Sequence, residues 1–115
     1  MSKNILIVED DVQLGETLFT MLELLGHRPT LCATVDRAFE LITEDHWDVI
    51  LSDYSLGTGT GADIMSRASA IQSRARLIIS SGYDRDQFEE ELQHLQQIHW
   101  INKPYKIEEL MALLK

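Results

Sequence analysis

Several polar side chains follow short apolar runs, and their types suit charge-driven chemistry. Glu9, Asp10 and Asp11 come directly after the first apolar run, and Asp53 follows the third. Carboxylates a few ångströms apart repel one another unless a proton or a cation joins them. A hard divalent cation with oxygen ligands, such as Mg²⁺, suits such a group. A lone acid more often caps a helix or starts a turn, but acids gathered at two strand ends favour a site.

The fourth and fifth apolar runs end in a hydroxyl and an ammonium group. Ser80-Ser81-Gly82 closes the fourth run, and Asn102-Lys103-Pro104 follows the fifth. A serine hydroxyl can donate a hydrogen bond to an anion, and a lysine supplies positive charge. Taken separately, the serines also suit a turn, and the lysine suits an exposed position before a helix-start proline. Together with the carboxylates they suit phosphoryl transfer to a carboxylate, which depends on positioning and charge neutralisation.

These side chains need a framework that brings strand ends together, and the apolar pattern predicts one. Continuous runs of Ile, Leu and Val favour strands of a parallel sheet covered on both faces. The predicted strands are residues 5–8, 30–33, 49–51, 77–79 and 98–101.

Apolar residues at helical spacing predict a helix after each strand. Gly26 provides a natural stop for the first helix. The apolar stripes are Leu14, Leu18, Met21, Leu22 and Leu25; Ala38, Leu41 and Ile42; Ala62, Met65, Ala68 and Ile71; Phe88, Leu92 and Leu95; and Ile107, Leu110, Met111 and Leu114.

Strand–helix alternation predicts a doubly wound α/β sheet in a single domain over residues 1–115, with no output domain in this chain. Ligands of such sheets bind at the carboxyl ends of the strands, near the switch point of the topology. The acids, Ser81 and Lys103 all fall at such ends. The sequence therefore predicts one site there.

Composition excludes several classes of protein. The net charge of −9 argues against direct nucleic-acid binding, because phosphate contacts need Lys and Arg. No apolar segment approaches the roughly 20 residues of a membrane helix, so we expect no membrane insertion. The single cysteine, Cys32, fits a reducing compartment and is expected to be a small buried residue. We expect a cytoplasmic protein.

Four motifs together resemble the receiver domain of response regulators in two-component signalling. Residues 3–11 read KNILIVEDD, residues 49–56 read VILSDYSL, residues 78–82 read IISSG, and residues 100–105 read WINKPY. Gly61 lies eight residues after Asp53, as in the family pattern. The resemblance covers the whole chain in the right order, and it implies a flavodoxin-like fold with five strands in the order 2-1-3-4-5 and five helices.

The resemblance implies a role for each residue of the predicted site. It makes Asp53 the phosphorylated residue and Mg²⁺ the cofactor. Asp10 and Asp53 would ligate the metal directly, Glu9 would act through water, and the carbonyl of Ser55 would be a further ligand. Two more residues match phosphoryl-binding positions: Ser81, whose hydroxyl would bond the phosphoryl group, and Lys103, which would pair with it.

Other positions match the family pattern less closely. Trp100 matches an aromatic position that often reorients on activation, but the indole is larger than the usual side chain. Gly57 stands where the family commonly has proline and begins a glycine-rich loop, expected to be flexible. Asp11 lies beyond the usual acidic pair and is expected to cap the first helix. Ser55 and Tyr83 match positions that tune the lifetime of the phosphoryl group.

The resemblance also implies partners. A sensor histidine kinase or a histidine phosphotransfer protein would supply the phosphoryl group, and the face near the last two helices would regulate a downstream target or output domain. The chain would then not be an enzyme, because it would catalyse only its own phosphorylation and dephosphorylation.

Three other functions share parts of this pattern. A haloacid-dehalogenase phosphatase also uses an Asp nucleophile, Mg²⁺, a hydroxyl and a lysine, but it needs a second aspartate where this chain has Ser55. A flavodoxin shares the architecture, but Glu9, Asp10 and Asp11 would repel its flavin phosphate. An interaction module that no longer takes phosphate is the third alternative, and the intact set of acids, hydroxyl and lysine argues against it.

Overall fold

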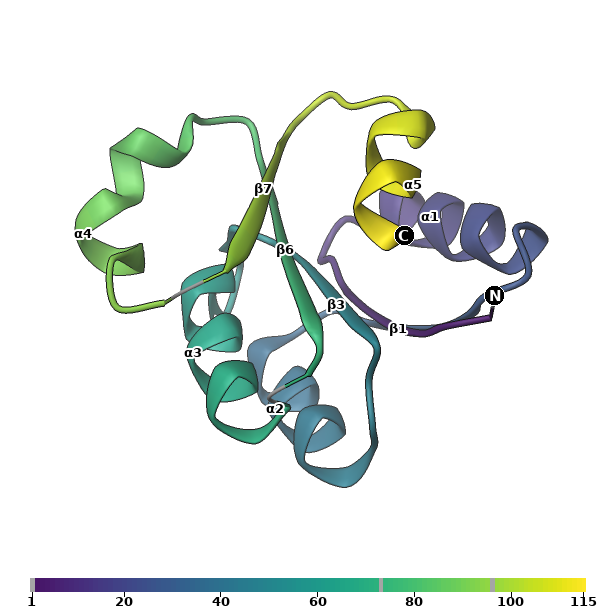
Figure 1. Cartoon of the computed structure of the whole chain (residues 1–115), viewed down its shortest axis with the longest axis horizontal. Helices are drawn as coiled ribbons and strands as arrows, with labels where there is room; N and C mark the ends of the chain where they lie inside the picture. The colour runs from purple at the N-terminus through teal and green to yellow at the C-terminus, as the bar shows by residue number, and fades with distance from the viewer. Residues whose placement is uncertain (1, 73, 96) are drawn as a thin grey trace.

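A computed structural model describes residues 2–72, 74–95 and 97–115, and in it five parallel strands form one twisted sheet (Figure 1). The strand order is β2-β1-β3-β6-β7. Because β6 and β7 are the predicted fourth and fifth strands, this order confirms the predicted order 2-1-3-4-5. Each strand lies within a residue or two of its predicted position. The bounds are Asn4–Val8 for β1, Arg28–Cys32 for β2, Val49–Asp53 for β3, Arg76–Ser81 for β6 and Ile98–Asn102 for β7.

The helices lie on both faces of the sheet, α1 and α5 on one face and α2 and α3 on the other (Figure 1). This arrangement confirms the doubly wound architecture. Their bounds are Val12–Leu24 for α1, Val35–Glu44 for α2, Gly61–Ile71 for α3, Glu89–Leu92 for α4 and Ile107–Leu114 for α5.

Alternate residues of each strand feed two separate cores. In β1, Ile5 and Ile7 pack with the buried leucines of α1 and α5, while Leu6 and Val8 pack with α2 and α3. All four side chains are buried, because helices cover both faces. This burial explains the continuous apolar runs and fixes the strand register, since a one-residue slip would exchange the two faces.

The first helix begins after Asp11 and ends before Gly26, as the sequence predicts. The side chain of Asp11 accepts a hydrogen bond from the Leu14 amide at 3.1 Å, so Asp11 caps the helix as expected. Gly26 has a φ of +91°, a left-handed conformation that glycine adopts without strain. The amide of His27 then donates to the Leu22 carbonyl at 3.0 Å and completes the helix end.

The region of the predicted fourth helix differs from the prediction. A 3₁₀ turn, η1, spans Arg85–Phe88, and the α-helix α4 covers only Glu89–Leu92. Leu95 lies beyond the helix, although Leu92 and Leu95 are both buried in the core as the pattern predicts. Periodicity detected the buried residues, but three apolar residues cannot fix the length of a helix.

The glycine-rich segment after Asp53, which we expected to be a flexible loop, forms a short hairpin. Strand β4, Ser55–Leu56, pairs antiparallel with β5, Gly59–Thr60. Thr58 Oγ1 accepts a hydrogen bond from the Val35 amide at 3.0 Å, which ties the hairpin to the start of α2. The hairpin therefore has a defined place beside the carboxyl ends of β1 and β3.

In the ranges that the structure describes, no helix is long and apolar enough to span a membrane.

Candidate functional site

The carboxyl ends of β1 and β3 bring three acids together, as the sequence predicts. The two strands are neighbours, with Val8 paired to Ser52, so Glu9 and Asp10 emerge beside Asp53. One carboxylate oxygen from each acid lies within 4.8 Å of the others. Glu9 is buried, Asp53 is half-buried and Asp10 is exposed, so the group forms a shallow site that opens to solvent.

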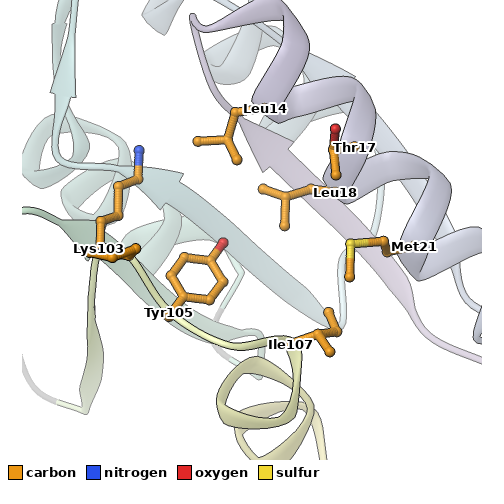
Figure 2. A pocket seen from close by; sticks show the side chains of 8 residues that line it. Leu14, Thr17, Leu18, Met21, Lys103, Tyr105 and Ile107 are labelled. Carbon is orange, nitrogen blue, oxygen red and sulfur yellow. The ribbon is translucent and has the colours of Figure 1, made fainter.

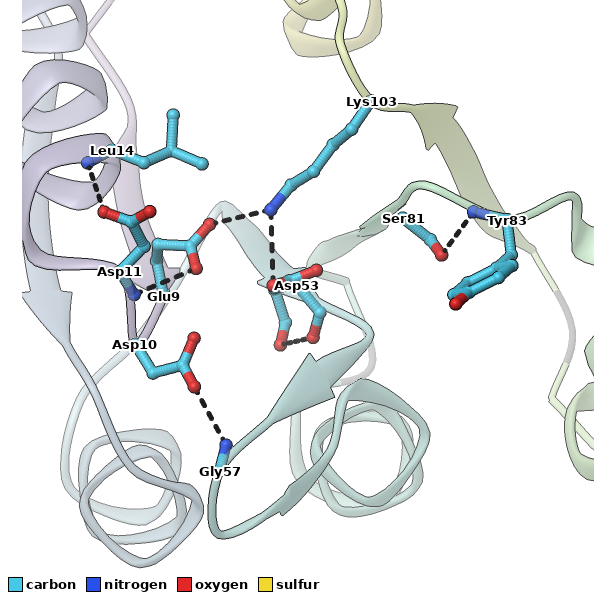
Figure 3. Close-up of polar contacts among 10 residues, drawn as sticks. Glu9, Asp10, Asp11, Leu14, Asp53, Gly57, Ser81, Tyr83 and Lys103 are labelled. Atoms are coloured by element: carbon cyan, nitrogen blue, oxygen red, sulfur yellow. Dashed lines mark hydrogen bonds and ion pairs between the residues drawn. The ribbon is translucent and has the colours of Figure 1, made fainter.

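Glu9 is a buried carboxylate with several partners. Its side chain is 4% exposed, and it accepts from the Asp11 amide at 3.3 Å and from Lys103 Nζ at 3.1 Å (Figure 3). Burial raises the pKa of Glu9, although the hydrogen bonds from Lys103 and the Asp11 amide oppose that shift. The positive charge of Lys103 stabilises the carboxylate of Glu9 in this buried position.

Lys103 joins two of the acids. Its Nζ lies 3.1 Å from Glu9 Oε1 and 3.2 Å from Asp53 Oδ2, and its backbone amide donates to the Ser81 carbonyl at 2.7 Å. Burial alone would lower the pKa of Lys103, but the hydrogen bond to Glu9 and the charge of Asp53 outweigh it, and the pKa is raised. Lys103 therefore carries a full positive charge beside Asp53.

Asp10 has a different partner. Its Oδ2 accepts from the amide of Gly57 at 2.9 Å, which connects the first strand's acid to the hairpin after Asp53. Its other oxygen points away from Gly57, toward Glu9 (Figure 3). This contact could not be predicted from the sequence, because a backbone N–H donor is not specific to any residue type.

Gly61 lies directly behind Asp53. A Cβ atom at Gly61 would lie 2.7 Å from the backbone oxygen of Asp53 and 3.2 Å from the Cα of Tyr54. The amide of Gly61 donates to the Tyr54 carbonyl at 2.7 Å. The close approach explains why a glycine stands at this distance in the sequence, since any side chain would push the end of β3 out of place.

Ser81 and Trp100 lie at the same edge of the sheet but make no hydrogen bond to the acids in the described part of the chain. Ser81 is buried, and its Oγ accepts from the Tyr83 amide at 3.0 Å, which leaves the hydroxyl hydrogen free to donate (Figure 3). Trp100 Nε1 donates to the Tyr83 carbonyl at 3.0 Å, and Asn102 Nδ2 donates to the same oxygen at 2.9 Å. Both predicted switch residues therefore contact one segment, the turn at Tyr83.

An aromatic cluster extends from the site toward α4. Tyr54, which follows Asp53 directly, lies with ring centroids 4.0 Å from Phe88 and 6.1 Å from Trp100. Phe88 and Trp100 stack at 5.8 Å. The hydroxyl of Tyr54 is bonded to the Glu91 carboxylate. This connection could not be predicted from the sequence, because the acidic run that contains Glu91 is typical of any exposed helix face.

Ser55 begins strand β4 and is exposed, two residues after Asp53. The direction of its carbonyl toward a metal stays a prediction from the family pattern. Its neighbour in the hairpin, Gly57, contacts Asp10, so the hairpin that carries Ser55 does reach the acidic group.

A groove of about 510 Å³ opens beside Lys103, between α1 and the segment that leads into α5 (Figure 2). The Tyr105 hydroxyl is buried and lacks a hydrogen-bond partner among the described residues. Burial, with the charges of Glu9 and Asp53, raises the pKa of Tyr105 to about 12, so the phenol stays neutral. The groove is lined by Leu14, Thr17, Leu18, Met21, Lys103, Pro104, Tyr105 and Ile107.

The donor set fits a hard divalent cation. The site contains three carboxyl groups and, beside them, the ammonium group of Lys103, so acidic groups outnumber the basic one. Carboxylate oxygens are the ligands that Mg²⁺ takes, and Mg²⁺ commonly combines one or two carboxylates with water and phosphate oxygens. An acidic site with one lysine beside it is thus suited to hold both a cation and a phosphoryl group.

Residues 5–115 match the family described as response regulator receiver domain. The match covers nearly the whole chain, and the chain belongs to this family. It is a receiver domain with an acidic pocket formed by Glu9, Asp10 and Asp53.

Two curated relatives differ in how much of their length the chain spans. Sporulation initiation phosphotransferase F from Bacillus subtilis is 25% identical over 115 residues, covering 100% of this chain and 93% of that protein. Swarming motility regulation protein RssB from Serratia marcescens is 30% identical over 114 residues, covering 97% of this chain and 51% of that protein. The chain thus spans nearly all of one relative and about half of the other.

A solved structure combines a similar fold with a metal. The receiver domain of sensor histidine kinase PA1611 from Pseudomonas aeruginosa is 28% identical, with a TM-score of 0.79 over 99% of this chain and 95% of that one. That structure has a magnesium ion coordinated in its active-site cleft.

Proposed function

We propose that this chain accepts a phosphoryl group on Asp53 from a phosphohistidine and so acts in a two-component phosphorelay. One observation carries the proposal: Lys103 Nζ lies within 3.2 Å of both Glu9 and Asp53, inside a group of three converging carboxylates. A structural ion pair needs one acid, whereas phosphoryl transfer to a carboxylate needs a nucleophile, a cation site and a separate positive charge. Asp53, the three converging carboxylates and Lys103 would supply these three groups.

In the proposed reaction, a carboxylate oxygen of Asp53 attacks the phosphorus of a partner's phosphohistidine. The new P–O bond forms as the P–N bond to the imidazole breaks, and the imidazole leaves with that electron pair and takes a proton. Lys103, already 3.2 Å from Asp53, pairs with a phosphoryl oxygen as charge builds there. Water later attacks the phosphorus of the acyl phosphate, the P–O bond to Asp53 breaks, and inorganic phosphate leaves as the Asp53 carboxylate is restored.

The group that would assist this reaction is Mg²⁺. Glu9, Asp10 and Asp53 would hold it, with the Ser55 carbonyl as a further ligand suggested by the family pattern. When bound, it supplies neutralisation of the carboxylates and of the phosphoryl oxygens. The convergence of three oxygen donors at a solvent-open position supports this assignment.

The phosphorylated state would bias the switch residues. The free hydroxyl hydrogen of Ser81 is available to a phosphoryl oxygen. A shift of Ser81 toward Asp53 would pull on the Tyr83 amide through the hydrogen bond that this amide donates to Ser81 Oγ. Trp100 is bonded to the carbonyl of the same Tyr83. Movement of this turn would therefore reach strand β7 and the face near α4 and α5, where we expect a downstream target to bind.

A partner that delivers the phosphoryl group must dock beside Asp53. The apolar groove between α1 and the start of α5 shares Lys103 with the acidic site, so a protein seated there would lie next to Asp53. We therefore assign the groove to the phosphodonor, a sensor histidine kinase or a histidine phosphotransfer protein.

Incubation with acetyl phosphate and Mg²⁺, followed by intact-mass measurement, tests the proposal. We expect a mass increase of one phosphoryl group that disappears in Asp53→Asn and when EDTA removes the metal. Asp86→Asn, which changes an exposed acid in η1, is the matched control and should label normally. Labelling that persists in Asp53→Asn, or none in the wild type, would contradict the assignment.

We further infer that the chain does not turn over external phosphate esters. A phosphatase of the related type needs a general acid two residues after its nucleophile, and Ser55 has no acidic proton to give. Sustained release of p-nitrophenol from p-nitrophenyl phosphate by the wild type, lost in Asp53→Asn, would overturn this view.

A further inference from the structure

The amide of Gly57 donates a hydrogen bond to Asp10 at the edge of the acidic site. The nitrogen lies 2.9 Å from Asp10 Oδ2, a usual length for a hydrogen bond between an N–H group and a carboxylate. Glu9 and Asp53 are both held by Lys103, whereas Asp10 is exposed and contacts this backbone group instead.

We propose that the Gly57 N–H is a positioning group for the divalent cation, since it holds Asp10 with its second oxygen directed toward Glu9 (Figure 3). The inference rests on the proposed metal-binding function of the site. An exposed aspartate without a partner samples several rotamers, and ordering it costs free energy when a metal binds. A hydrogen bond already made in the metal-free protein removes part of that cost.

The donor is itself held in place from two sides. The hairpin that carries Gly57 is fixed at its base by the hydrogen bond from Gly61 to Tyr54, 2.7 Å long. Near its tip, Thr58 Oγ1 accepts from the amide of Val35 at 3.0 Å. A donor on an anchored hairpin can orient a side chain, whereas a donor on a free loop would move with it.

Two substitutions separate the effect of losing the Gly57 N–H donor from the effect of adding a side chain at this position. Gly57→Ala keeps the donor, and its Cβ would lie 3.6 Å from Asp10 Oδ2, an ordinary van der Waals contact. Gly57 is not among the residues with positive φ, so alanine can adopt this backbone. Gly57→Pro removes the donor, and the preceding Leu56 lies in strand β4, the extended conformation that precedes proline readily.

Calorimetric titration of the whole chain with Mg²⁺ alone, at fixed pH and ionic strength, tests the proposal. We expect Gly57→Ala to bind within about twofold of the wild type and Gly57→Pro to bind about tenfold more weakly, the effect typical of an outer-sphere partner. Equal affinity of Gly57→Pro and wild type would overturn the inference, as would an equal loss in both variants. Absence of Mg²⁺ binding by the wild type would overturn the proposed function as well.

A second measurement does not depend on the proline variant. By nuclear magnetic resonance, amide exchange at Gly57 in the metal-free protein should be at least about tenfold faster in Asp10→Ala than in the wild type, because the hydrogen bond is lost. Unchanged exchange at Gly57 would refute the positioning role, even if Gly57→Pro failed to fold.

Discussion

Replacing Gly61 by alanine should displace the residue that we propose to be phosphorylated. The new Cβ would lie 2.7 Å from the backbone oxygen of Asp53, 3.3 Å from its carbonyl carbon and 3.2 Å from the Cα of Tyr54. All three contacts are with backbone, which cannot rotate aside as a side chain does. The end of β3 or the start of α3 must therefore move.

The expected size follows from two opposing effects. Alanine is favoured over glycine in helices by about 1 kcal/mol, so helix propensity alone predicts stabilisation at this first residue of α3. Overpacking of a rigid contact typically costs about 1–3 kcal/mol and also strains the Gly61–Tyr54 hydrogen bond. We expect the steric cost to exceed the propensity gain and to lower the free energy of unfolding by about 1–2 kcal/mol.

Urea unfolding followed by tryptophan fluorescence measures this difference. Gly82→Ala is the matched control, because a Cβ at Gly82 would meet no atom within 4 Å. That variant should match the wild type or be slightly more stable, since alanine restricts the unfolded chain. In addition, Gly61→Ala should label more slowly with acetyl phosphate under conditions where it is fully folded. A Gly61→Ala protein as stable as Gly82→Ala would refute the steric reasoning.

Two further predictions follow from the buried charge and the buried thiol. Lys103→Gln should lower the free energy of unfolding by about 1–3 kcal/mol, because it leaves Glu9 buried without its cation. Adding Glu9→Gln should recover most of that loss. A double variant no more stable than Lys103→Gln would contradict this prediction. Burial raises the pKa of Cys32 to about 11, so at pH 9 about one thiol in a hundred is ionised in the folded state, and reaction with a thiol reagent should speed up about tenfold per pH unit. Reaction at pH 8 as fast in native protein as in urea would show that the thiol is not protected.

The sheet and the acidic group were predictable because strong local signals carry them. Residues 5–8, 49–51 and 77–79 are apolar throughout, and such runs are seen where both faces of a parallel strand are covered. Once β1 and β3 are neighbours, the positions of Glu9, Asp10 and Asp53 follow from the strand ends. Lys103 was predictable for the same reason.

Other features depend on contacts that leave no pattern in the sequence. Strand β2 begins at Arg28, earlier than predicted, because pairing with β1 extends through Pro29, a residue that is uncommon in strands but is tolerated in an edge strand such as β2. The length of α4 could not be predicted, because three apolar residues at helical spacing do not determine where a helix begins and ends. The hydrogen bond from the Gly57 amide to the Asp10 carboxylate joins residues that are 47 positions apart in the chain.

The ion pair between Lys103 and Glu9 spans 94 positions of the chain, and this has a consequence for how the protein is made. On the ribosome, the strands emerge in an order that lets the sheet grow outward from β1 through β3 and β6 to β7. All three acids of the site are synthesised by residue 53, and the lysine that offsets them follows fifty residues later. At roughly 5–20 residues per second, the nascent chain carries uncompensated carboxylates for several seconds. The acidic site therefore cannot be complete until β7 and the lysine that follows it have been synthesised.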